Sequence, residues 1–85
     1  MDRTDARRDM DQFFLLFEEW EAADQAAARA DCCLGRSLDA YCDGIGPVPS
    51  AESIAEAKRL RAHASQRLRE IRVYVQQARK NARVI

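Results

Sequence analysis

The fold is decided by residues 44–50, Gly-Ile-Gly-Pro-Val-Pro-Ser, because this stretch gathers the residues that interrupt helices. Four of the five Gly and Pro residues of the 85-residue sequence lie in it. Proline disfavours helix in the residue before it, whereas Ser50 is a good N-cap for a helix that follows. The stretch therefore predicts a turn between two long helical segments.

Both flanking segments have the composition and spacing of long helices. The first is expected to cover about residues 4–43, with Thr4 as its N-cap, and the second about residues 51–83. Apolar residues recur in both at the heptad spacing that is typical of coiled coils. These positions are Met10, Phe13, Phe17, Trp20, Ala27, Leu34, Leu38 and Tyr41 in the first segment, and Ile54, Ala57, Ala64, Leu68, Ile71, Val75, Ala78, Ala82 and Ile85 in the second.

The chain is therefore expected to be one all-α domain, residues 1–85, folded as an antiparallel two-helix hairpin. Aligning the two apolar stripes about the turn places Ala27 opposite Leu68 and Phe13 opposite Ala82. In this register large side chains often face small ones, which favours interdigitated packing.

The apolar surface of the first segment is wider than one partner helix can cover, since Phe14 and Leu16 lie beside its stripe. A domain of this size is also marginally stable unless it is cross-linked or oligomeric. We therefore expect two hairpins to form a homodimeric four-helix bundle, and the alternative is a monomer whose aromatic residues bind a different protein. The predicted interface residues are Phe13, Phe14, Phe17, Trp20, Leu60 and Tyr74.

The two halves of the chain carry opposite charge. Residues 1–43 hold eleven acidic and five basic residues, a net charge of −6, and residues 50–85 hold three acidic and nine basic residues, a net charge of +6. In a bundle the acidic helix of one chain could lie on the basic helix of the other, and such charges set partner and register more than stability.

Three charged residues interrupt the apolar stripes: Asp24, Asp31 and Arg61. The preferred interpretation is a buried polar layer, with a salt bridge that penalises wrong alignments of the helices. The other interpretations are a partner contact and a metal or catalytic site. Carboxylates on facing helices can bind metal, but the Glu-x-x-His element usual in such bundles is absent.

The sulfur-containing residues offer a weaker hypothesis. The vicinal pair Cys32 and Cys33 could form a thiol or metal site with Asp31 and His63, but it lacks the C-x-x-C spacing of zinc sites. Small side chains at half-buried positions are the simpler interpretation, and Cys42 is expected to pack on the turn. An odd number of cysteines, with a vicinal pair, is typical of free thiols in a reducing compartment.

The basic second segment raises the possibility of nucleic-acid binding. Nine Lys and Arg residues along one helix could follow a phosphate backbone. They are, however, distributed around the helix, and the acidic first segment would repel the same polymer.

The sequence as a whole predicts a non-enzymatic, cytoplasmic interaction or adaptor protein with no cofactor, acting as a homodimer that binds a protein partner. The alternatives are a small nucleic-acid-binding protein and a thiol- or metal-binding protein. The longest apolar run, residues 13–17, is too short to span a membrane or to form the core of a signal peptide.

Overall fold

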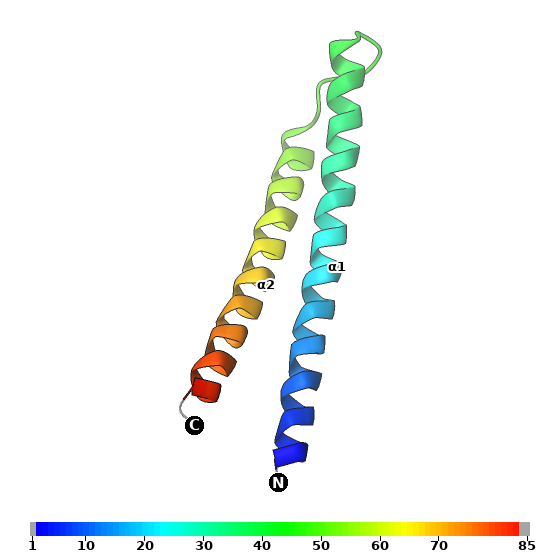
Figure 1. Ribbon diagram of the computed structural model, residues 1–85. Coiled ribbons are helices and arrows are strands. Elements are labelled where there is room, and N and C mark those ends of the chain that lie inside the picture. Colours follow the sequence, from blue (N-terminus) through cyan, green and yellow to red (C-terminus); the bar gives the residue numbers. More distant parts are fainter. Residues whose placement is uncertain (1, 84–85) are drawn as a thin grey trace.

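The computed structural model describes the backbone of residues 2–83 and the side chains of residues 10–81. Two helices make up this part of the chain, α1 (Asp2–Cys42) and α2 (Ala51–Arg83), and they pack against each other as a hairpin (Figure 1). The predicted all-α hairpin is thus confirmed. Helix α1 begins two residues before Thr4, which lies inside the first turn instead of capping it.

The end of α1 is a Schellman motif. The Ile45 amide donates to the Ala40 carbonyl at 2.9 Å, and the Gly44 amide donates to the Tyr41 carbonyl at 3.0 Å. Gly44 has a φ of +75°, in the left-handed region that a residue with a Cβ rarely adopts. The glycine therefore reverses the chain and satisfies carbonyl groups that the helix end leaves without partners.

Helix α2 starts at the predicted cap. The Ser50 Oγ accepts a hydrogen bond from the Ser53 amide at 3.1 Å and lies 2.8 Å from the Ser53 Oγ. This is the N-cap geometry that satisfies one of the unpaired amides of the first helical turn.

The register of the two helices differs from the predicted one. Ala27 packs in a cluster with Ala64 instead of Leu68. The ring of Phe13 lies beside Tyr74, and the side chain of its predicted partner Ala82 lies outside the described residues. Each pairing is displaced by about one to two helical turns.

The connector explains this displacement. At Gly46 the backbone runs so close to α1 that an added Cβ would lie 3.0 Å from the Cβ of Ala40. The connector thus folds back along the last turns of α1, and the first turns of α2 lie beside Ser37 and Cys33. The end of α1 projects beyond the start of α2 (Figure 1).

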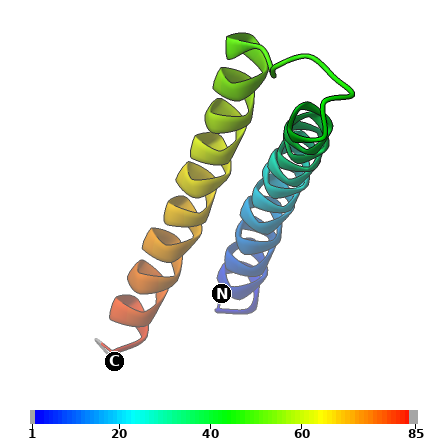
Figure 2. The same cartoon turned by 90° about the horizontal axis from the view of Figure 1, so that it is seen from above.

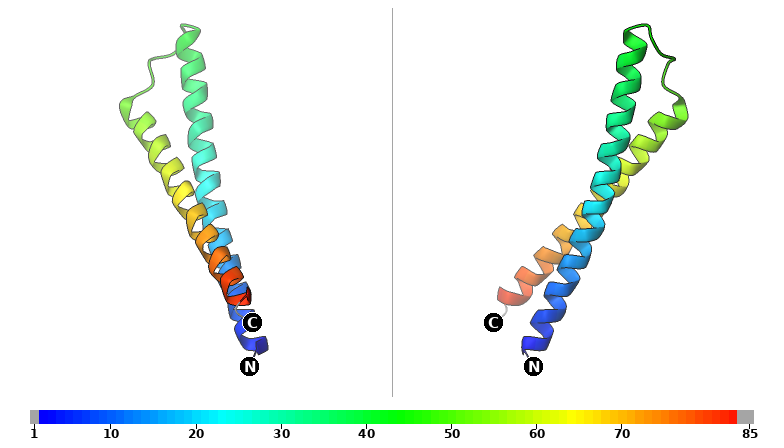
Figure 3. Two further views of the ribbon diagram at one scale, coloured as in Figure 1. Left: turned by 60° about the vertical axis from the view of Figure 1, so that its left-hand side comes forward. Right: turned by 90° about the vertical axis from the view of Figure 1, so that its right-hand side faces the viewer.

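The helices form a single layer in which each has only the other as a neighbour (Figure 2). They cross near their middle and diverge on both sides of the crossing, including toward the connector (Figure 3). Among residues 10–81 only four alanines are buried, and no larger side chain is. They are Ala23, Ala27, Ala57 and Ala64.

This core is small for the length of the chain. The radius of gyration is 19.2 Å, against about 12 Å for a compact domain of this length. The accessible surface is 7094 Å², whereas about 5,100 Å² is usual for a folded monomer of 9.7 kDa. The hairpin therefore leaves about 2,000 Å² more surface exposed than a compact monomer would.

The two helices, as far as residues 2–83 are concerned, contain no stretch that is both apolar and long enough to cross a lipid bilayer.

Candidate interaction face

An aromatic cluster occupies the open end of the hairpin, away from the connector. Phe13 lies at its centre, with ring centroids 5.9 Å from Phe14, 6.4 Å from Phe17 and 6.5 Å from Tyr74 of α2. Trp20 extends the cluster along α1, 5.5 Å from Phe17. The structure thus brings together five of the six predicted interface residues.

Helix α2 covers this cluster only in part. Phe13 and Trp20 are half-buried, but Phe14 is 52% exposed and Phe17 is 38% exposed. Aromatic side chains contribute most to packing when they are enclosed, so this surface lacks a neighbour in the single chain. The sixth predicted interface residue, Leu60, instead packs against the alanine cluster between the helices.

The three charged residues of the stripes form one ion-pair triad. The Arg61 guanidinium donates from Nη2 to Asp31 Oδ2 at 2.8 Å and from Nη1 to Asp24 Oδ1 at 3.1 Å. The pKa of Arg61 is raised, mainly by its hydrogen bond to Asp31. The side chains are 46% exposed for Arg61, 44% for Asp24 and 49% for Asp31, so the single hairpin does not bury them as the sequence predicts.

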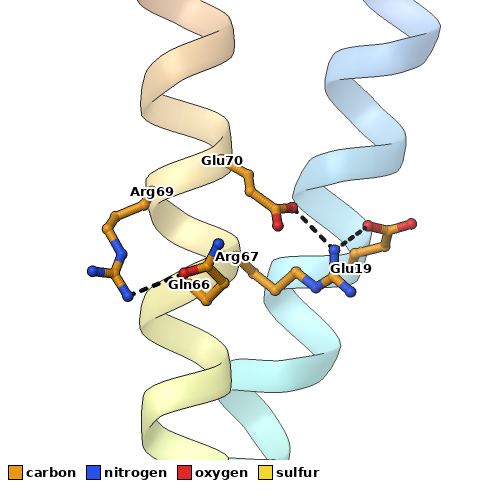
Figure 4. Close-up of polar contacts among 5 residues, drawn as sticks. All are labelled: Glu19, Gln66, Arg67, Arg69 and Glu70. Atoms are coloured by element: carbon orange, nitrogen blue, oxygen red, sulfur yellow. Dashed lines mark hydrogen bonds and ion pairs between the residues drawn. The ribbon is translucent and has the colours of Figure 1, made fainter.

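A second interhelical ion pair lies closer to the open end (Figure 4). The Arg67 Nη1 donates to Glu19 of α1 at 3.3 Å and to Glu70 of its own helix at 3.0 Å. Arg69, two residues further along α2, donates instead to Gln66 within α2 and reaches no residue of α1 (Figure 4). Sequence reasoning did not single out this pair, although the opposite charges of the two segments indicate contacts of this kind.

An apolar groove of about 420 Å³ lies between the helices toward the connector, where they separate. Leu34, Ile54 and Ala57 line it, and the triad residues Asp31 and Arg61 lie at its edge. The groove was not predicted from the sequence, because it arises where the helices cross and diverge.

One stripe of α1 links the aromatic cluster to the triad and the groove. Phe13, Phe17, Trp20, Asp24 and Asp31 follow one another at spacings of four, three, four and seven residues. This heptad spacing keeps all of them on the same side of a helix. The parts of these side chains that α2 leaves exposed, together with Phe14, form a continuous face, which we name the interaction face, and a second chain could cover it in one piece.

The cysteines and the histidine form no recognisable site. Cys32, Cys33 and Cys42 are free and exposed, and His63 is exposed. In the part of the chain that the structure describes, no three His, Cys, Asp or Glu side chains are grouped as a metal site.

Several bases of α2 are already engaged by acids. Arg59 forms a bidentate pair with Glu56, with nitrogen–oxygen distances of 2.6 and 3.0 Å, while Arg61 and Arg67 contact α1. The bonds from Arg59 lower the pKa of the Glu56 carboxyl below its ordinary value of 4.5. A nucleic acid would have to displace these contacts to reach the same guanidinium groups.

Comparison with protein-family models, curated proteins and solved structures gives no match for this chain.

Proposed function

We propose that the chain is a non-enzymatic helical interaction protein, and that it acts as a homodimer in which two hairpins form a four-helix bundle. The observation that carries this proposal is the mismatch between a core of four alanines and an aromatic cluster that α2 covers only in part. Burial of apolar surface is the main source of folding free energy, so a hairpin with so small a core gains most from a second chain.

The amount of exposed surface fits a partner of the same size. The excess of about 2,000 Å² over a compact monomer is comparable with the surface that stable homodimers bury. Covering the interaction face would also enclose Phe14 and Phe17 and remove solvent from the Asp24–Arg61–Asp31 triad. The buried polar layer that the sequence predicts would then exist in the dimer.

A role without catalysis is supported by the chemistry of the described side chains. The pKa shifts of Glu56, Arg59 and Arg61 all arise from exposed ion pairs. Such shifts are typical of structural charge pairs. The proposal includes a cytoplasmic location, which the free thiols support. Binding of a further protein would use the charged outer faces of the bundle.

Sedimentation equilibrium of the full chain tests the dimer. The wild-type chain is expected to sediment with twice the mass of 9.7 kDa at micromolar concentration. Phe17→Ala should raise the dimer dissociation constant at least about tenfold, because truncating a buried aromatic anchor costs more than about 1.4 kcal/mol. Alanine preserves helix propensity, so circular dichroism should show an intact helical chain.

Val73→Ala is the matched control, because Val73 is 56% exposed and lies nine residues from the buried Ala64, which places it on the side of α2 that faces away from α1. It should leave the dissociation constant unchanged. A wild-type chain that sediments as a compact monomer, or equal effects of the two substitutions, would contradict the proposal.

A further inference from the structure

The opposite charges of the two helices constrain how two copies can pair. On α1, residues 10–28 contain five acidic residues and no Lys or Arg. On α2, residues 58–72 contain six basic residues and one acidic residue. The groove repeats this division, since Asp31 lies on its α1 side and Lys58 and Arg61 lie on its α2 side.

Twofold symmetry allows two ways of stacking the hairpins face to face. With the axis along the helices, both connectors lie at one end, and each α1 lies against the α2 of the other copy. With the axis across the helices, the connectors lie at opposite ends, and each helix lies against its own counterpart. The second arrangement sets the acidic stretch of α1 against an identical acidic stretch.

Like charges facing each other across an interface cost free energy, whereas opposite charges set partner and register. Resting on the proposed homodimer, we infer that its twofold axis runs along the helices, with both connectors at the same end and each acidic α1 against the partner's basic α2. The occupant of the interaction face is thus a second copy of this chain in one defined orientation.

The position of the groove agrees with this arrangement. Stacking α1 on the partner's α2 places the two apolar grooves at the same end, where the hairpins can close them together.

A distance between spin labels tests the orientation directly. Cys42 lies at the connector end of α1 and is exposed, so Cys32→Ser with Cys33→Ser leaves it as a single labelling site. Double electron–electron resonance on the full-length dimer should give a Cys42–Cys42 separation of no more than about twice the 18 Å width of the hairpin. Connectors at opposite ends would instead give a separation that approaches the 64 Å length.

A second label at the open end provides an independent reading. Gln77→Cys in a chain that lacks the three native cysteines should also give a short separation, because Gln77 is exposed on α2 near that end. A dimer with long separations at both positions would overturn the inferred axis and leave the proposed homodimer standing. A monomeric mass with no dipolar coupling would overturn both.

Discussion

Arg61 of α2 holds two carboxylates of α1 at once: its Nη2 lies 2.8 Å from Asp31 and its Nη1 lies 3.1 Å from Asp24. The two acids are seven residues apart, so they lie on the same side of α1 two turns from each other. Two donor groups of one guanidinium thereby bond to two positions of α1 that lie two turns apart. This triad couples the helices where the alanine core provides little contact area.

We first predict that the Arg61–Asp31 pair stabilises the hairpin, whereas the Arg59–Glu56 pair stabilises only the local helix. Arg61→Gln and Asp31→Asn, alone and combined, should show a favourable coupling in thermal unfolding midpoints followed by circular dichroism. The effect should be a few degrees at most and should decrease with added salt, because all of these groups are partly exposed.

The matched control is the corresponding cycle of Arg59→Gln and Glu56→Gln, whose residues lie three apart on α2. Its coupling should be smaller, since it joins no second helix. Equal coupling in the two cycles would contradict the prediction that the triad stabilises the hairpin.

The glycines give a second prediction, because two of them should respond to alanine in opposite directions. At Gly35, inside α1, an added Cβ would meet nothing within 4 Å, so Gly35→Ala should stabilise the chain by about 0.5–1 kcal/mol. At Gly44 the φ of +75° is unfavourable for alanine, so Gly44→Ala should destabilise it by about 1 kcal/mol.

Urea unfolding of both variants measures these free energies. Gly46→Ala adds a further comparison, because its Cβ would approach the Cβ of Ala40 to 3.0 Å and force the connector to shift. A stable Gly44→Ala chain would mean that the Schellman motif does not end α1 as described.

Our third prediction concerns acid. The hydrogen bonds from Arg59 favour ionised Glu56, so its folded pKa lies below the ordinary value of 4.5. The pair therefore contributes fully at pH values above about 4.5, and its contribution is lost as the pH falls through the lowered pKa of the folded chain. Carbon-detected NMR titration of the Glu56 carboxyl should show this lowered midpoint.

Arg59→Ala should return the Glu56 midpoint to the ordinary range, because it removes the main cause of the shift. Arg61→Ala should leave it unchanged, since Arg61 bonds to acids of α1. A Glu56 midpoint that does not respond to Arg59→Ala would rule out this pairing in solution.

The local features of this protein follow from short-range chemistry that is legible in the sequence. Ser50 caps α2 because its hydroxyl reaches the amide three residues on, and Gly44 ends α1 because it tolerates the left-handed backbone. The aromatic cluster is predictable for the same reason, because heptad spacing places Phe13, Phe17 and Trp20 on one side of any helix.

The register of the two helices and the groove between them could not be predicted from such short-range patterns. The position of α2 along α1 depends on how far the connector runs back along α1 before α2 begins. The close packing of Gly46 on Ala40 sets this distance. Stripes of similar apolar residues can align at several offsets of about one turn, so the pattern alone cannot choose among them. The groove beside Leu34 and Ile54 follows from the same offset and from the crossing of the helices.

The sequence by itself determined two helices, their turn, their opposite charges and the grouping of aromatic side chains, because these depend on neighbours within a few residues. Only the tertiary structure decided that Arg61 joins Asp24 to Asp31 and that the core consists of four alanines. Both depend on the offset between helices, which the folded-back connector selects. In the single chain Phe14 remains 52% exposed and Phe17 38% exposed.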